Sequence, residues 1–283
     1  MAVTLADGTI EYANPHLRRL LDLGAAQTLG PDLAEFREAG GASLPETIRG
    51  LLLAGKSWQG ETHFRTATGE ARHVLESIYP LPECNRGVTR FIHFFQDFTA
   101  LKLAETLKNL AFYDSLTGLP NRNLLADRVS RAIAAAQRNC SRFALLYIDI
   151  DHFKRVNDTL GHDAGDALLR QLAARLQKCI RRTDTVARLG GDEFVVILDK
   201  VADRGPAVGL ARKLLETCSE DYDLPANGGK VTLSVGISLY PRDGSDMEAL
   251  LKCADAAMYR AKAKGGNGYR LCQSPLSAQC GSA

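Results

Sequence analysis

The chain has 283 residues, of which 45% are hydrophobic and 24% are charged, and its formal net charge is +2. This length favours two domains, and the composition is that of an ordinary globular protein. A charge so close to neutral gives no electrostatic reason to expect nucleic acid or a membrane surface as a partner, and no segment approaches the roughly 18 apolar residues of a membrane-spanning helix.

The N-terminal residues and the cysteines indicate the compartment. Residues 1–8 already contain an acid and a glycine, so we do not expect a signal peptide. The seven cysteines are scattered and odd in number, and none forms a Cys-x-x-Cys pair. We therefore expect free thiols in a cytoplasmic protein, and neither a disulfide framework nor a zinc site.

Residues 1–99 predict a small domain with short strands and helices. Asp7-Gly8 marks a turn between two strands, and apolar residues at helical spacing follow from Leu17 to Leu21. A second helix is predicted over 45–54. Three strands come next, at 58–66, 72–81 and 88–97, with a turn at 68–70 and a connection at 82–87.

Several short motifs in this half carry a family resemblance. They are Asp7-Gly8-Thr9-Ile10, Ala13-Asn14, Trp58-Gln59-Gly60-Glu61, Gly69-Glu70 and Gln96-Asp97-Phe98-Thr99. Residues 1–99 resemble a PAS domain, which implies an antiparallel sheet with short helices and a regulatory role. The ligand that it senses is not readable: His16, His63, His73 and His93 are conceivable haem ligands, but a single histidine in a small domain is more often structural.

Residues 100–113 predict a helix with a narrow apolar seam. Ala100, Leu103, Leu107 and Leu110 are spaced by three, four and three residues, which gives about two heptads of a coiled coil. The helix either packs on its own domain or pairs with a second copy. Because it joins two predicted domains, we favour a signalling helix that contributes to a homodimer.

The second half alternates helices and strands. Helices are predicted at 121–137, 164–179, 206–220 and 245–263, and strands at 143–148, 185–189, 194–198, 231–239 and 269–271. Ser245, with Glu248 three residues later, is the expected cap of the last helix. This pattern predicts a sheet with helices packed against it, and we expect the polar tail 273–283 to be disordered.

Two groups of carboxylates lie at the ends of predicted strands. Gly190-Gly191-Asp192-Glu193 separates two apolar runs and predicts a hairpin turn with adjacent acids. Such acids suit a bound cation, although the turn on its own is more typical of a solvated loop. Asp149 and Asp151 follow a strand that is apolar throughout, where a carboxylate is costly unless it is paired or binds metal.

Five ordered blocks make this half recognisable. They are Asp114 to Arg122, Asp149 to Asp166, Arg188 to Phe194, Ser234 to Ser238 and Ala254 to Lys262. Residues 110–272 resemble the GGDEF domains of diguanylate cyclases. The resemblance implies an α+β fold with a mainly antiparallel central sheet flanked by helices, as in nucleotidyl cyclases. It also implies a homodimer that condenses two GTP into cyclic di-GMP and releases two pyrophosphates.

The resemblance also assigns residues to the reaction. Asp149, the Ile150 carbonyl and Asp192 are the implied ligands of Mg²⁺ or Mn²⁺. Asp192 and Glu193 are the implied catalytic acids. Glu193 is either a further metal ligand or the base for the attacking 3′-hydroxyl, and only geometry can decide between the two.

The remaining family positions contact the nucleotide. The implied substrate-binding residues are His152, Phe153, Lys154 and Lys262 at the phosphates, Asn157 and Asp166 at the guanine, and Gly190 and Gly191 against the nucleotide. The chain departs from the family at Gly266, where many relatives have a basic residue. We expect weaker GTP binding from that change, partly offset by Lys264.

An inhibitory site is implied just before the hairpin. Arg181 and Asp184 match an RxxD motif that binds cyclic di-GMP in the family, and we place Arg188 with them. The alternative is an ordinary cation-rich helix end. The domain plan is therefore a PAS domain at 1–99, a linker helix at 100–113, a GGDEF domain at 114–272 and a tail. The rival to a cyclase is a non-catalytic module that binds cyclic di-GMP or GTP, and the intact acids favour the enzyme.

Overall fold

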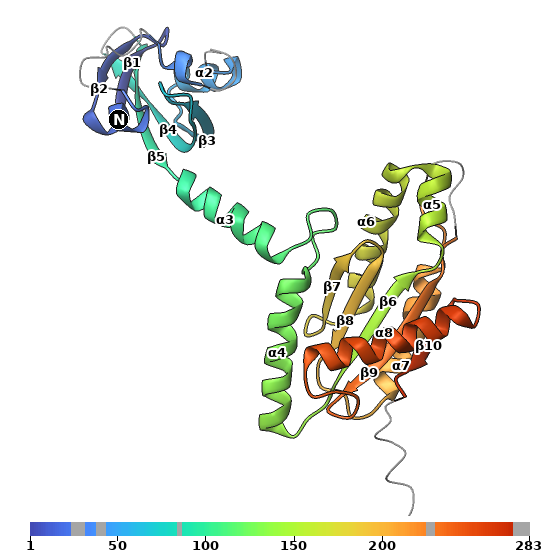
Figure 1. The fold of residues 1–283 in the computed structure, drawn as a ribbon. Coiled ribbons are helices and arrows are strands. Elements are labelled where there is room, and N and C mark those ends of the chain that lie inside the picture. The colour runs from blue at the N-terminus through green and yellow to red at the C-terminus, as the bar shows by residue number, and fades with distance from the viewer. Residues whose placement is uncertain (24–31, 38–43, 84–86, 225–229, 274–283) are drawn as a thin grey trace, which may run out of the picture. The chain divides into compact units, whose positions relative to one another are not determined.

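The computed structural model describes residues 1–23, 32–37, 44–83, 87–224 and 230–273 (Figure 1). The chain divides into two compact units, Met1–Leu107 and Lys108–Ala283. Parts of the predicted 82–87 connection and of the 273–283 tail lie outside the described residues. Within the described residues, no helix is long and apolar enough to cross a membrane.

The first unit is built on an antiparallel sheet with the strand order β2-β1-β5-β4-β3. The strands are β1 (Ala2–Leu5), β2 (Ile10–Ala13), β3 (Trp58–Arg65), β4 (Ala71–Glu83) and β5 (Gly87–Asp97). The helices are α1 (Pro15–Leu20), α2 (Glu46–Leu53) and the 3-10 turn η1 (Leu33–Phe36). Residues from α1 and η1 pack with the sheet into one apolar core, and this arrangement confirms the predicted PAS architecture.

A buried polar network lies within this unit. Glu76 accepts hydrogen bonds from Arg37 Nη2 at 2.6 and 2.7 Å, and its Oε1 lies 2.8 Å from His93 Nδ1. The other ring nitrogen of His93 lies 3.0 Å from Thr4 Oγ1. Burial by itself raises the pKa of Glu76, but His93 and Arg37 outweigh it and leave that pKa lowered. Because both ring nitrogens of His93 are engaged, this histidine is structural.

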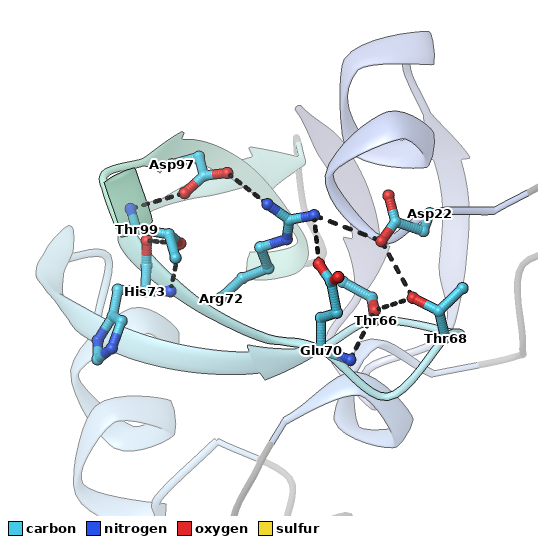
Figure 2. Close-up of polar contacts among 8 residues, drawn as sticks. All are labelled: Asp22, Thr66, Thr68, Glu70, Arg72, His73, Asp97 and Thr99. Carbon is cyan, nitrogen blue, oxygen red and sulfur yellow. Dashed lines mark hydrogen bonds and ion pairs between the residues drawn. The ribbon is translucent and has the colours of Figure 1, made fainter. Parts of the chain in front are cut away.

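Groups at the end of β5 and near the start of β4 hold the beginning of the linker helix α3 (Thr99–Phe112). Thr99 N–H donates to Asp97 Oδ1 at 2.9 Å, and Thr99 Oγ1 accepts from His73 N at 2.8 Å (Figure 2). The Arg72 guanidinium lies 3.9 Å from Asp97 and 3.0 Å from Glu70. The end of β5 and the beginning of α3 are thereby tied to β4.

The apolar seam of α3 faces outward. Leu103, Leu107 and Leu110 are 58%, 57% and 64% exposed, and Leu101 is 70% exposed. The helix has no buried residue among those described. These leucines therefore do not pack on their own domain, which was the alternative to pairing with a second copy.

The second unit contains a five-stranded sheet with the order β10-β9-β6-β8-β7. Its strands are β6 (Phe143–Ile150), β7 (Thr185–Gly190), β8 (Glu193–Leu198), β9 (Leu233–Tyr240) and β10 (Gly268–Leu271). Its helices are α4 (Arg122–Asn139), α5 (Phe153–Leu160), α6 (His162–Cys179), α7 (Gly205–Cys218) and α8 (Met247–Ala263). Only the β9–β10 pair is parallel, so the predicted mainly antiparallel sheet is confirmed.

Strand β6 is central, and every residue in it is buried. Ala144, Leu146, Ile148 and Ile150 pack with residues of α6 and α7. Phe143, Leu145 and Tyr147 pack with residues of α4 and α8 on the other face (Figure 1). Because strand residues alternate in direction, Asp149 belongs to the face that α8 covers. The alternation of β6 therefore places α8 on the same face of the sheet as Asp149.

Two local expectations are corrected. Helix α8 begins at Met247, so its cap is Asp246, whose Oδ1 accepts from Ala249 N at 2.9 Å, and not Ser245. Aspartate and serine cap equally well, so the sequence could not choose between neighbours. The segment Phe153–Leu160, for which the sequence analysis predicted no helix, forms the helix α5.

The expectation of free thiols throughout is wrong for one pair. Cys253 on α8 and Cys272 after β10 form a disulfide, with Cα atoms 5.6 Å apart. The packing of α8 along β9 and β10 brings them together, and a separation of 19 residues in sequence does not reveal this proximity. Of the other described cysteines, Cys140, Cys179 and Cys218 are free, while Cys84 and Cys280 lie outside the described residues.

Candidate active site

The acidic turn lies where β7 and β8 meet. Gly190 and Gly191 have φ angles of 150° and 51°, and residues with side chains rarely adopt such values. The antiparallel register places Glu193, at the start of β8, directly opposite Asp149 near the end of β6. A predicted metal ligand, Asp149, and a predicted catalytic acid, Glu193, are thus cross-strand neighbours although they are far apart in the sequence.

Asp149 is the most strongly perturbed acid of the site. Asp149 is 6% exposed, and its Oδ1 lies 2.6 Å from the Lys262 ammonium group. The pKa of Asp149 is raised to about 6, chiefly by burial and also by the charges of Asp192 and Glu193, while Lys262 acts in the opposite direction. The charges of Asp192 and Glu193 therefore disfavour the ionised form of Asp149, and a cation would relieve that repulsion.

The oxygen atoms here suit a hard divalent cation. Asp149 Oδ1 is fully buried and, apart from the Lys262 ion pair, has no hydrogen-bond partner in the described part of the chain. Carboxylate and backbone carbonyl oxygens are the donors that Mg²⁺ prefers. Within that same part, no three Asp, Glu, His or Cys side chains converge into a ready-made metal cluster. A metal here would therefore need Asp149 and Asp192 together with a backbone carbonyl such as that of Ile150.

The predicted phosphate-binding segment opens helix α5. His152 precedes the helix with a left-handed φ of 59°, and Phe153 and Lys154 occupy its first turn. The first N–H groups of a helix have no intrahelical acceptor and suit an anion. Lys154 is exposed, whereas Lys262, which we also expected at the phosphates, is engaged by Asp149.

The two residues predicted to bind guanine lie on neighbouring helices, Asn157 on α5 and Asp166 on α6. Asn157 on α5 packs against Gly165 on α6, where a Cβ atom would collide with the Asn157 amide. Asp166 is the next residue of α6, and both Asn157 and Asp166 are half-buried. Asn157 therefore lies against α6 one residue before Asp166.

Sequence reasoning did not anticipate the partner of Arg188. The Arg188 guanidinium donates to the Gly191 carbonyl at 2.8 and 3.0 Å and to Asp114 Oδ1 at 2.9 Å. Burial raises the pKa of Asp114, but Thr117 and Arg188 outweigh it and leave that pKa lowered. Asp114 is the first residue of the first family motif, and its place in that motif was the one sign in the sequence that it has a specific role. The ion pair ties the start of the domain to the acidic turn.

Two of the three predicted inhibitory residues, Arg181 and Asp184, line a cavity of about 410 Å³ that does not include the acidic turn. Arg181 and Asp184 line it together with Lys178, Lys200 and Lys213. Asp184 accepts from Arg181 N at 3.0 Å and from Asp199 N at 3.3 Å, so its carboxylate shapes the turn. Arg188, which we predicted together with Arg181 and Asp184, is not among the described residues that line this cavity. Its guanidinium instead contacts the acidic turn.

Comparisons with known proteins place both units in families. The model of the diguanylate cyclase GGDEF domain matches residues 111–268, and a PAS domain model matches residues 1–100. The bifunctional diguanylate cyclase/cyclic di-GMP phosphodiesterase MucR of Pseudomonas aeruginosa is 46% identical over 172 residues, which are 61% of this chain and 25% of MucR. The diguanylate cyclase TpbB of P. aeruginosa is 41% identical over 170 residues, which are 59% of this chain and 39% of TpbB.

Solved structures agree with these matches. The GGDEF domain of TpbB (PA1120) superposes with a TM-score of 0.54 at 40% identity, over 56% of this chain and 98% of that one. The coiled coil and GGDEF domain of DgcB from Caulobacter crescentus, in complex with c-di-GMP, gives a TM-score of 0.54 at 29% identity over 61% and 91%. The chain spans well under two thirds of either curated relative. It belongs to the GGDEF family of diguanylate cyclase domains, here preceded by a PAS domain.

Proposed function

We propose that this chain is a diguanylate cyclase that condenses two GTP molecules into cyclic di-GMP. The observation that carries the proposal is the cross-strand pairing of Asp149 with Glu193 beside the acidic turn, where the charges of Asp192 and Glu193 help to raise the pKa of the buried Asp149. A module that only binds nucleotide needs cations and hydrogen-bond donors, and gains nothing from a buried carboxylate with two further acids near it. The name of TpbB, a diguanylate cyclase with a related domain, supports the same reaction.

In the proposed reaction, the 3′-oxygen of one GTP attacks the α-phosphorus of the other. A new O3′–P bond forms, the bond from that phosphorus to the oxygen bridging to the β-phosphate breaks, and pyrophosphate leaves. Glu193 accepts the proton of the 3′-hydroxyl, because it stands opposite the buried Asp149 and is itself only half-buried. Repeating the step in the opposite direction closes the ring and releases a second pyrophosphate.

The phosphates and the base have separate binding elements. The N–H groups of Phe153 and Lys154 bind the terminal phosphates at the start of α5, where helix dipole and charge both favour an anion. Asn157 and Asp166 bind the guanine. The Asp166 carboxylate accepts from the ring N–H and the exocyclic amine of guanine, a donor pair that adenine lacks, so the site selects GTP over ATP.

The reaction needs a divalent cation, Mg²⁺ or Mn²⁺. Asp149, Asp192 and the Ile150 carbonyl would hold it, and Lys262 would then be free to move from Asp149 to the phosphates. When bound, the metal polarises the α-phosphate and neutralises charge on the leaving pyrophosphate. The observation that supports this position is the buried Asp149 Oδ1, for which the described residues provide the Lys262 ammonium group and no hydrogen-bond donor besides it.

Two copies of the chain are required, because each GGDEF domain holds one GTP and the two must face each other. The exposed leucines of α3 are the proposed pairing surface, and the PAS domain would act on activity through this helix. Product binding at Arg181 and Asp184 would inhibit the enzyme, since the cavity beside them gathers Lys178, Lys200 and Lys213 around a site for phosphates.

The test is incubation of the purified protein with GTP and Mg²⁺, with the products separated by chromatography and identified by mass. Cyclic di-GMP should form in wild type, should vanish with a metal chelator, and should fall at least about a hundredfold in Asp192→Asn. Asp158→Asn, an exposed acid on α5, is the matched control and should retain activity. Binding of cyclic di-GMP or GTP without any turnover would instead establish the non-catalytic module.

A further inference from the structure

A further cavity, with a volume of about 490 Å³, lies at the end of the sheet away from the catalytic acids. We call it the arginine cavity, because its described lining includes Arg142, Arg204 and Arg242, together with Asp203, Tyr240 and Pro241. The register pairs Phe143 with Tyr240 at this end of β6, whereas Asp149 lies near the other end, about 20 Å away at the rise of a strand. The cavity also shares none of its described lining residues with the cavity beside Arg181 and Asp184.

Hydrogen bonds fix the walls of the arginine cavity on two sides. After β9, the Oδ2 atom of the buried Asp243 accepts from Leu239 N at 2.8 Å, and Asp243 N donates to the Leu239 carbonyl at 2.8 Å. Before β6, Val201 N donates to the Arg142 carbonyl at 2.9 Å, and Arg142 Nη1 donates to the Ala202 carbonyl at 3.4 Å. A site whose walls are already held in place loses less conformational entropy when a ligand binds.

The positive charge of this cavity is poorly neutralised by the protein itself. In the part of the chain that the structure describes, the Arg204 guanidinium has no hydrogen bond or ion pair. Arg242 lies 3.7 Å from Asp243 and its side chain is 56% exposed. Asp203, the one acid among the described lining residues, accepts from Gly205 N at 2.6 Å at the start of α7. Three cations therefore face the cavity with one acid that is already engaged, and such a surface concentrates anions.

We propose that the arginine cavity binds the phosphate chain of a small molecule, at a site separate from the catalytic acids and from the inhibitory residues. Guanidinium groups bind phosphate oxygens through paired hydrogen bonds, and three of them match the several charges of a di- or triphosphate. The volume lies within the range of small-molecule sites, roughly 300–1,000 Å³. Tyr240 and Pro241 provide an apolar wall beside the cations, so the phosphate chain is either free or part of a nucleotide.

The binding test is calorimetric titration of the full chain with tripolyphosphate, in chelator and at physiological salt. Saturable binding is expected for wild type. The double variant Arg142→Gln/Arg242→Gln should raise Kd at least about tenfold, because it removes two guanidinium groups from the cavity. The matched control is Arg128→Gln/Arg170→Gln, which removes the same charge from exposed arginines of α4 and α6 outside the described lining. It should change Kd less than about twofold.

Two further measurements locate the site and identify the ligand. Tripolyphosphate should slow amide hydrogen exchange in wild-type peptides that cover residues 201–205 and 240–243. Arg204→Gln removes a guanidinium that makes no contact in the described part of the chain, so this variant should fold normally and still raise Kd about threefold. Titration with ATP separates the two sources of a phosphate chain: tighter binding than tripolyphosphate indicates a nucleotide, and equal or weaker binding indicates a free phosphate chain.

The proposal is overturned if wild type shows no saturable binding, if the double variant binds as tightly as wild type, or if the control variant loses as much affinity as the double variant. Exchange that slows only around Arg181 or in α5 would also overturn it, because the ligand would then occupy a site already described. Failure of the proposed function is distinct, since a chain without GTP turnover would refute the cyclase and leave these binding measurements unaffected.

Discussion

Replacing Asp149 by asparagine should abolish activity and yet stabilise the metal-free protein. Its pKa is raised to about 6 from an ordinary value of 3.8, chiefly by burial. Between these two pH values the unfolded chain ionises while the folded chain keeps its proton, so stability falls as pH rises. Above about pH 6 the full penalty is present, and a difference of this size corresponds to about 3 kcal/mol. Asparagine stays neutral and escapes that penalty.

The assay is urea unfolding of wild type and Asp149→Asn at pH 4 and pH 8, in chelator and in saturating Mg²⁺. In chelator at pH 8 the variant should be more stable by up to about 3 kcal/mol, and at pH 4 the two proteins should be alike. Mg²⁺ should stabilise wild type at pH 8 and leave the variant unchanged, because a ligand stabilises only the state that binds it.

The exposed Asp158 supplies the control, since Asp158→Asn removes the same charge without a burial penalty and should match wild type at both pH values. An Asp149→Asn variant that is less stable than wild type in chelator at pH 8 would refute the reasoning. It would mean that the Lys262 ion pair outweighs burial and repulsion by Asp192 and Glu193.

Three further outcomes are expected. Arg181→Ala should retain turnover and weaken inhibition by cyclic di-GMP at least about tenfold, and unchanged inhibition would remove Arg181 from the proposed site. Leu107→Lys should weaken self-association at least about tenfold by sedimentation, because it places a charge in the exposed seam; a dimer of unchanged stability would exclude α3 as the pairing surface. Alkylation of the unfolded, unreduced protein should modify two thiols fewer than after reduction, and equal numbers would show that Cys253 and Cys272 are unlinked.

The sequence predicted elements whose signal is local. The uninterrupted apolar run at 143–148 is the central strand β6, and the apolar runs around Gly190 and Gly191 are the hairpin β7–β8. Both strands can be predicted because the apolar residues along the sequence show which side chains must be buried. Helix α5 was missed although Phe153, Val156 and Leu160 have helical spacing, because the segment is short and otherwise polar.

The features that the sequence could not predict depend on contacts between distant residues. Asp151 finds its donors 83 and 116 residues away, at Ser234 and Asn267. The disulfide between Cys253 and Cys272 likewise depends on the packing of α8 against the edge of the sheet.

The central claim is that the acids of this site join two GTP molecules. Its most direct test is to quantify cyclic di-GMP and pyrophosphate together, in one reaction of the purified chain with GTP and Mg²⁺. The proposed reaction requires two pyrophosphates for each cyclic di-GMP, with neither product formed from ATP. Release of inorganic phosphate or GMP without cyclic di-GMP, or no consumption of GTP at all, would contradict it.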